Sequence, residues 1–191
     1  MADNPTGVRI AGSRFITVNG LTLSSASYGV LADSSTNQSL TLSNLNLSST
    51  RPSGVGLRMN GAGLTVSQVI ANHRNSGIEV DNGASNVSIA GFTANNTTLG
   101  MAWSAVVPPV VLTGITAKDS GTALRFANVA GPWTLSPTTL VTHDFSGSYE
   151  SLVFEGTANG VTVEGFRLPG LTRGLLLNTS TSNFVVGDLD A

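Results

Sequence analysis

One pattern of apolar residues recurs along the whole chain and constrains its fold more than any other feature. In the stretch "GIEVDNGASNVSIAGFTANNTTLG", which begins at residue 77, apolar residues stand at five positions: Ile78, Val80, Val87, Ile89 and Phe92. The same skeleton returns at an offset of 23 residues, with Met101 in the first slot. Followed in both directions, the pattern starts at residues 8, 30, 57, 78, 101, 124, 152 and 175. The chain is therefore a series of one repeated unit.

Each unit contains short segments in which apolar and other residues alternate. A period of two is typical of a β-strand that directs alternate side chains inward and outward. Gly, Asn, Ser and Asp fill the joints between the segments, as turns require. Short strands that recur with a period of 20 to 30 residues predict a parallel β-solenoid. The sixth unit is the least regular, because Thr138 stands in its third apolar slot.

This rhythm resembles the right-handed parallel β-helix of the pectate-lyase-like superfamily, which includes many phage tailspikes. We therefore predict an all-β chain: a single-stranded right-handed parallel β-helix of about eight coils, each of three short strands. We expect residues 1–191 to form one domain. Handedness follows from the coil length and from the resemblance.

Composition excludes several classes of function. Charged residues make up 10% of the chain and the net charge is −2, so no basic surface for nucleic acid or for an anionic membrane is expected. No cysteine is present, which excludes disulfides and thiolate metal sites. The start, "MADNPTGVRI", lacks the regions of a secretory signal. We expect no cofactor, and a location on a virion surface or outside the cell.

In a stacked solenoid, equivalent positions of successive coils form columns. The second inward position of the first strand carries Trp103, Phe126 and Phe154 in three successive coils. An inward aromatic stack is the expected interpretation, with sugar platforms at Trp103 and Trp133 as the alternative.

The outward position of the first strand contains several apolar residues, and "AVVPPVV" follows nearby. Exposed apolar area often marks a partner interface. The candidate interface residues are Leu31, Ala102, Val107, Val153 and Leu176. They predict self-association or docking to a larger assembly, and the tailspike resemblance implies a trimer.

A row of Thr, Ser and Val occupies the outward position of the second strand. It runs Thr17, Thr41, Thr65, Ser88, Val111, Thr134, Thr162 and Val185. Such a row suggests the ordered water of an ice-binding solenoid, although β-branched residues suit strands in any case. Because the flanking residues look irregular, ice binding is the lesser hypothesis.

Charged residues gather after the first strands of neighbouring coils. If the chain is an enzyme, Arg58, Glu79 and Asp81 form the best acid–base cluster, with His73 near them. Asp33, Asn60 and Asp81 are a candidate calcium site, although Asp and Asn at strand ends more often make turns. The resemblance implies calcium-binding aspartates with an arginine base, or paired aspartates with Gly-His-Gly, and neither set can be matched here.

Two further groups of polar residues lie in loops. His73, Asn96 and Asp119 form a column in the turn after the third strand, where solvated turn residues are expected. Two insertions leave the third strand and are candidate binding loops. Their candidate residues are Arg51, His143, Asp144 and Tyr149.

These features predict a non-enzymatic structural or adhesive β-helix. The expected setting is a virion surface component, such as a decoration or tailspike-like protein, or a segment of a surface adhesin. A glycan is a possible ligand. The alternative is a lyase, hydrolase or epimerase that acts on acidic polysaccharides through Arg58, Glu79 and Asp81.

Overall fold

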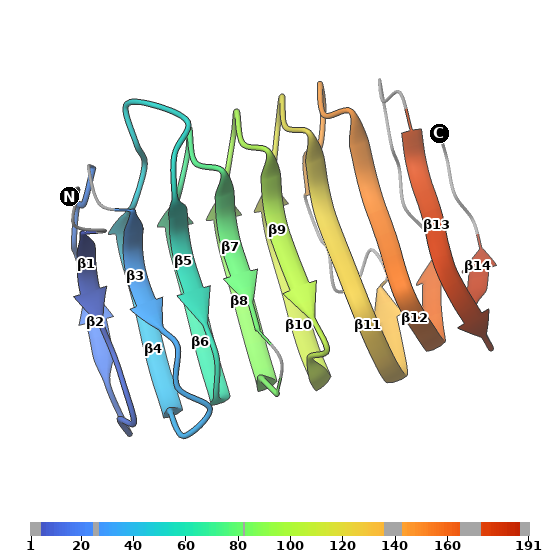
Figure 1. The fold of residues 1–191 in the computed structure, drawn as a ribbon, viewed down its shortest axis with the longest axis horizontal. Coiled ribbons are helices and arrows are strands. Elements are labelled where there is room, and N and C mark those ends of the chain that lie inside the picture. Colours follow the sequence, from blue (N-terminus) through green and yellow to red (C-terminus); the bar gives the residue numbers. More distant parts are fainter. Residues whose placement is uncertain (1–4, 25–26, 82, 136–142, 165–172, 188–191) are drawn as a thin grey trace.

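The computed structural model describes residues 5–24, 27–81, 83–135, 143–164 and 173–187. Its elements are all β-strands, stacked side by side along one long axis from the N-terminal to the C-terminal end (Figure 1). No helix in this part of the chain is long and apolar enough to cross a membrane. The strands are β1 (Thr6–Arg9), β2 (Thr17–Asn19), β3 (Tyr28–Ala32), β4 (Gln38–Asn46), β5 (Val55–Met59), β6 (Ala62–Ile70), β7 (Ser76–Val80), β8 (Ser85–Thr93), β9 (Leu99–Ser104), β10 (Val107–Thr116), β11 (Thr122–Leu135), β12 (Glu150–Glu164), β13 (Arg173–Ser182) and β14 (Val185–Gly187).

The first sheet contains one strand from every predicted coil. Its order is β1-β3-β5-β7-β9-β11-β12-β13, with β14 paired to β12, and every pairing is parallel. Val8 pairs with Val30, and Val30 pairs with Leu57. The same column continues through the first apolar residue of each later coil to Leu175. The predicted coil starts and their register are confirmed, in a solenoid of about seven turns.

The second sheet runs β10-β8-β6-β4-β2 and is also parallel. It stops at β10, because no ladder joins β10 to β11 among the described residues. In β11 and β12 the strand continues through the corner instead, so that Trp133 pairs with Val161 as an extension of the first sheet. The third apolar slots of the last three coils, Thr138, Phe166 and Leu189, lie outside the described residues.

The core is the column of inward side chains between the sheets. Trp103 and Phe126 stack with centroids 6.1 Å apart, and Phe126 stacks on Phe154 at 5.0 Å. Trp133 meets Trp103 edge to face. Trp103 and Trp133 are 1% and 4% exposed. The core interpretation of the aromatic column is therefore confirmed, and neither indole presents a face to solvent.

Glycines close the corner that leads into the first sheet. Gly56, Gly77 and Gly100 occupy equivalent positions just before the first inward residue of their coils. A Cβ added at Gly77 would lie 2.5 Å from the Cβ of Ala94, inside any normal contact distance. Close approach of two chain segments therefore requires glycine there. The sequence analysis did not identify this column.

Asparagines organise the turn after the third strand. The backbone N–H of Asn95 donates to Asn72 Oδ1 at 2.8 Å, and the backbone N–H of Lys118 donates to Asn95 Oδ1 at 3.0 Å. The next residue of each turn has a positive φ, namely His73 (55°), Asn96 (55°) and Asp119 (51°). These three residues thus form a stacked column of turn residues, as their spacing predicted.

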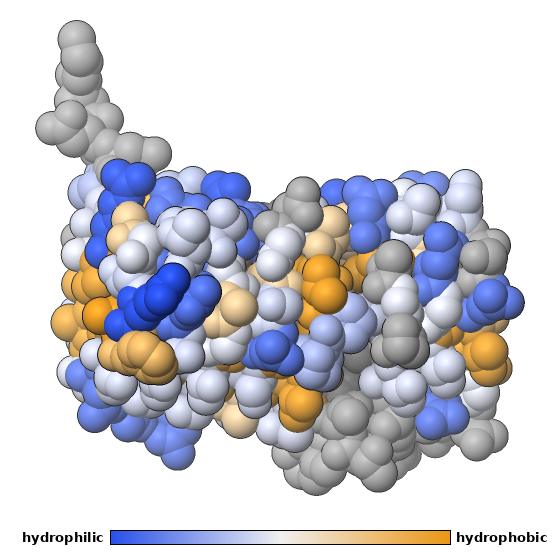
Figure 2. Space-filling model, turned by 90° about the horizontal axis from the view of Figure 1, so that it is seen from below, coloured by the Kyte–Doolittle hydropathy of each residue, from blue (hydrophilic) through white to orange (hydrophobic). Residues whose placement is uncertain are grey.

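The outer surface carries both hydrophilic and hydrophobic residues. In Figure 2, which looks at the molecule from below, strongly hydrophilic residues gather in the N-terminal half, and hydrophobic residues form separate patches. No continuous hydrophobic band crosses the described residues in this view.

Candidate functional site

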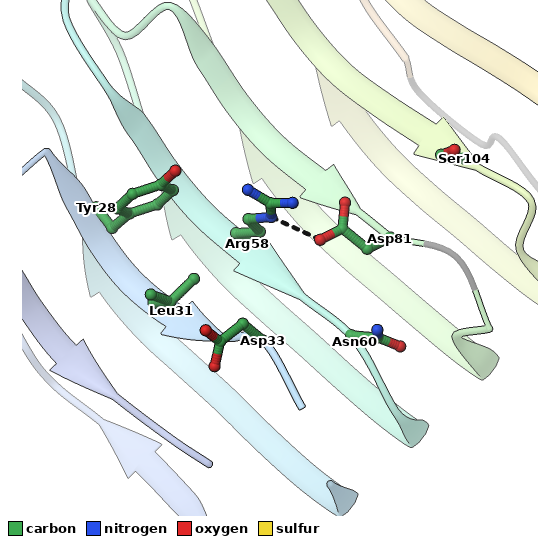
Figure 3. A pocket seen from close by; sticks show the side chains of 7 residues that line it. All are labelled: Tyr28, Leu31, Asp33, Arg58, Asn60, Asp81 and Ser104. Atoms are coloured by element: carbon green, nitrogen blue, oxygen red, sulfur yellow. Dashed lines mark hydrogen bonds and ion pairs between the residues drawn. The ribbon is translucent and has the colours of Figure 1, made fainter. Parts of the chain in front are cut away.

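A polar cleft of about 570 Å³ lies on the outer face of the first sheet. Its walls come from four successive coils, and Figure 3 shows their side chains above the strands. The lining residues are Tyr28, Leu31, Asp33, Arg58, Asn60, Asp81 and Ser104.

The stacking of coils positions these side chains. Leu31 pairs with Arg58, and Arg58 pairs with Glu79, so outward side chains of neighbouring strands stand side by side. Asp33, Asn60 and Asp81 follow the ends of β3, β5 and β7, and form a second row beside the first. A column of the sequence therefore becomes a row of side chains about 4.8 Å apart.

Arg58 is the charged centre of the cleft. Its Nε donates to Asp81 Oδ2 at 2.5 Å, whereas Glu79 Oε2 lies 3.9 Å away. The hydrogen bond that Arg58 donates to Asp81 is the main cause that raises the pKa of Arg58, against the opposing effect of burial. The predicted cluster of Arg58, Glu79 and Asp81 thus meets around one guanidinium, and Asp81 is its closer partner.

The same diagonal ion pair occurs three times on this face. In each case an arginine in the first outward row contacts a carboxylate in the second row of the following coil. Arg9 contacts Asp33 at 3.3 Å, and Arg125 contacts Glu155 at 2.5 Å. Arg58 with Asp81 is the third example. The cationic side chains of the face are therefore already neutralised by the protein itself.

One polar atom of the cleft lacks a partner. Asn60 Oδ1 is buried and has no hydrogen-bond partner. A buried polar atom without a partner costs free energy that a ligand donor would recover. The cleft is therefore lined by a residue with an unpartnered acceptor, together with the hydroxyl groups of Tyr28 and Ser104.

The structure brings together the predicted acid–base cluster, but as an ion pair. Arg58, Glu79 and Asp81 lie on adjacent strands, and His73 is not among the cleft residues. General acid–base chemistry needs a group that is free to exchange a proton with the substrate. Asp81 instead accepts a hydrogen bond from Arg58.

The predicted calcium set has a similar outcome. Asp33, Asn60 and Asp81 do follow successive strands along one side of the cleft (Figure 3). Asp33 contacts Arg9 and Asp81 contacts Arg58, so each carboxylate already faces a cation. Among the described residues, no group of three or more His, Cys, Asp or Glu side chains is placed to hold a metal ion.

The predicted loop residues lie away from this cleft. None of Arg51, His143, Asp144 and Tyr149 lines it. Asp144 pairs with Lys118 at 2.5 Å, and the His143 ring lies 4.8 Å from the Phe145 ring. Tyr149 is 50% exposed beneath the guanidinium of Arg173. Arg51 is exposed between β4 and β5.

The predicted apolar flank is discontinuous. Val107 is 51% exposed, whereas Leu31, Ala102 and Leu176 are half-buried. Val153 is only 2% exposed, so the expectation that it contributes exposed apolar surface is wrong. Strand parity gives the face on which a residue lies, and it does not report what packs over that face.

Two cleft residues were missed by the sequence analysis. Ser104 stands in the same column as Asp33, Asn60 and Asp81, one coil further on. Extending that column by one repeat would have found it. Tyr28 is the first residue of β3, and its long side chain lines the cleft. No repeated pattern in the sequence indicates this position.

Comparison with known families agrees with this architecture. Residues 6–132, about two thirds of the chain, match the family described as right handed beta helix region. The chain belongs to this family. No curated protein and no solved structure matches it significantly. The handedness predicted for the β-helix is therefore supported by the family as well as by its parallel coils.

Proposed function

We propose that this β-helix is a non-enzymatic adhesive and structural element, which binds a neutral glycan in the cleft around Asn60. We place it on a virion surface or in an extracellular adhesin, as part of a larger or self-associated assembly. The single observation that carries the glycan proposal is the buried, unpartnered Asn60 Oδ1 within a polar cleft.

The charges of the cleft favour a neutral ligand. Arg58 is engaged by Asp81 and approached by Glu79, so its guanidinium has little capacity left for a uronate. An acidic glycan would also be repelled by Glu79 and Asp81, because these two carboxylates share the single positive charge of Arg58. Sugar hydroxyls both donate and accept hydrogen bonds, and they suit a site with one free acceptor and two hydroxyl groups.

The experiment measures glycan binding and cleavage together. The protein is screened on an array of neutral and acidic oligosaccharides, and hits are titrated by calorimetry. Asn60→Leu should weaken binding of a neutral hit about threefold to tenfold, as expected for the loss of one hydrogen bond. Asn19→Leu, on the second sheet, is the matched control and should bind normally.

Cleavage of an oligosaccharide on the array would favour the alternative function, that of an enzyme. If uronate polymers are cleaved, and cleavage is lost in both Arg58→Ala and Asp81→Asn, the alternative of a polysaccharide-cleaving enzyme is correct. Equal binding by wild type and Asn60→Leu would remove the assigned site.

A further inference from the structure

Phe15 is an exposed aromatic residue at the corner between the two sheets. It lies just before β2, and its side chain is 81% exposed. Its backbone has a positive φ of 56°, which is uncommon for a bulky residue. Neither feature stabilises the isolated chain. An exposed aromatic side chain is typical of a residue that is buried in an interface between proteins.

The neighbouring coils carry small or polar residues at the same corner. The pairing of the second sheet places Ser39, Gly63 and Asn86 beside Phe15 in the next three coils. Each of them also has a positive φ. Gly and Asn adopt this conformation more readily than other residues do. Phe15 is therefore the exception in this corner column, and the repeat of the fold does not explain it.

An apolar cleft of about 600 Å³ opens at the same corner, further along the solenoid. In the fifth coil the strand register shifts between Val107 and Val110, so that the two prolines between them stand at the corner. These four residues of β10 form one wall of the cleft, and residues of β11 form the other. None of the described lining residues is charged. Clefts of roughly 300–1,000 Å³ accommodate small organic groups, and a phenyl ring is such a group.

The positions of Phe15 and of the apolar cleft suit a pair of antiparallel chains. Between four and five strand spacings of about 4.8 Å separate them, which is roughly 19–24 Å along one edge of the solenoid. A two-fold axis at the middle of this edge brings Phe15 of each copy to the cleft of the other copy. Gly63 stands near that midpoint, and its lack of a side chain permits close approach. Both contacts then form together, as in the isologous interface of a two-fold dimer.

A parallel arrangement of copies does not make these contacts. In parallel copies at the same level, as in a three-fold trimer, Phe15 of one copy lies level with Phe15 of the next. The apolar cleft then lies roughly 19–24 Å away from it along the axis. The edge therefore favours a dimer over the trimer that the tailspike resemblance implies.

The surface beside this edge contains no charge that a dimer would have to desolvate. The five strands of the second sheet carry no charged residue. Val111 of β10 is 45% exposed on this surface. Arg14, which precedes Phe15, is exposed at the end of the edge, and charged residues are common at the rim of an interface.

The available area indicates a weak dimer. Four strand spacings of about 4.8 Å and five residues at about 3.3 Å give a flat footprint of roughly 300 Å². A buried Phe side chain adds about 200 Å². Two copies together therefore bury on the order of 1,000 Å², the range of transient complexes. We expect a dimer that forms at high protein concentration and dissociates on dilution.

From the exposed Phe15, the apolar cleft on the same edge and the uncharged surface beside them, we infer that two copies of the chain form an antiparallel dimer. Each Phe15 fills the apolar cleft of the other copy. The inference rests on the self-association in the proposed function and names its interface. The glycan site is separate, because the cleft around Asn60 lies on the first sheet.

The first test is the mass of the protein in solution, measured by sedimentation over a range of protein concentrations. Wild type should approach twice the mass of one chain as the concentration rises. Phe15→Asn should remain a monomer, with a Kd at least about 100-fold weaker, because each dimer loses two buried phenyl groups. Its circular dichroism should be unchanged, since Asn86 already occupies the equivalent corner of the fourth coil.

The second test places a charge in the apolar cleft. Val107 lines the cleft and is 51% exposed, and Val185 in β14 is 54% exposed and does not line it. Val107→Lys should therefore abolish the dimer, whereas the matched control Val185→Lys should dimerise as wild type does. A mixture of Phe15→Asn with Val107→Lys should associate more tightly than either variant alone, because one intact pair of Phe15 and cleft remains between them.

Several outcomes overturn the inference. These are a wild type that stays monomeric, a stable trimer, equal association by Val107→Lys and Val185→Lys, or a dimer that persists in Phe15→Asn. Glycan titration of the same samples tests the other proposal separately. Monomeric wild type that binds a neutral glycan would refute the dimer alone, and dimeric wild type that binds no glycan would refute the glycan site alone.

Discussion

The two sheets of this β-helix are alike inside and opposite outside. Inward positions of both carry buried apolar residues, such as Leu57 in β5 and Leu64 in β6, each exposed by 1% or less. Outside, the first sheet carries arginine–carboxylate pairs, whereas the five strands of the second sheet contain no charged residue and expose side chains such as Thr65. The core requires only apolar volume at the inward positions. The outward positions are therefore free to carry different chemistry on each face.

The sheets also differ in continuity between the fifth and sixth coils. The first sheet continues without interruption, since Leu124 in β11 pairs with Met101 in β9. The second sheet ends at β10, which leaves an apolar cleft of about 600 Å³ beside Val107 and Trp133. Beyond that cleft the coils rejoin, because Thr116 forms a parallel bridge with Asp144. Backbone pairing thus joins the fifth and sixth coils both before and after the cleft along the chain.

The largest expected effect comes from the glycine column, which lies at the first sheet alone. Gly77→Ala would place a Cβ 2.5 Å from the Ala94 Cβ and 2.5 Å from the Gly100 oxygen. Because one of these atoms belongs to the backbone, the corner must shift. We expect a loss of about 2–3 kcal/mol in the free energy of unfolding, measured by urea denaturation.

Gly187→Ala is the matched control. An added Cβ there meets its nearest atom, the Glu164 Cβ, at 3.8 Å, and the residue has no positive φ. Its stability should change by less than about 0.5 kcal/mol. Equal losses in the two variants would contradict the packing role of the glycine column.

The sequence was sufficient for the fold because a solenoid repeats one local rule. Val8, Val30 and Leu57 were aligned from spacing alone, and they pair in the structure. The candidate site was predicted less completely. Spacing placed Arg58 beside Glu79, but side-chain length and rotamer decide that Asp81 is the closer partner.

Burial of outward residues was the least predictable feature. Leu31 and Val153 share a column, yet Leu31 lines an open cleft and Val153 is buried. Their difference arises from what surrounds each coil, which a repeat cannot encode.

A smaller effect tests whether the ion pairs give the first sheet its distinct electrostatics. The Arg125 and Glu155 side chains are 39% and 33% exposed, so the pair is worth at most about 1 kcal/mol. Arg125→Met should destabilise the protein by that amount at low salt. The loss should shrink in about 1 M NaCl, where charges are screened.

Thr65→Met, on the uncharged face, is the control for this measurement. Its effect on the free energy of unfolding should not depend on salt, because no charged residue lies in β6 or its neighbours. Salt dependence that is the same for both variants would show that the diagonal pairs do not distinguish the two faces.

The smallest effect concerns Asp144, which helps to join the coils where the second sheet is interrupted. Burial opposes ionisation of this carboxyl, but hydrogen bonds from Lys118 and Ser146 outweigh it and lower its pKa. A lowered pKa in the folded state stabilises the protein above the unfolded pKa of about 4, and this contribution is lost as the pH falls through the folded value. Asp144→Asn should therefore reduce the free energy of unfolding at pH 7 by at most about 1 kcal/mol, since both side chains of the pair are about 40% exposed.

The stabilities of the variant and of wild type, measured by urea denaturation, should converge as the pH drops toward about 2. Lys118→Met should show a weaker form of the same convergence, because the bonds from Ser146 remain. A stability difference that stays constant from pH 7 to pH 2 would mean that Asp144 acts through packing and backbone pairing, and that its charge contributes nothing to this joint between the coils.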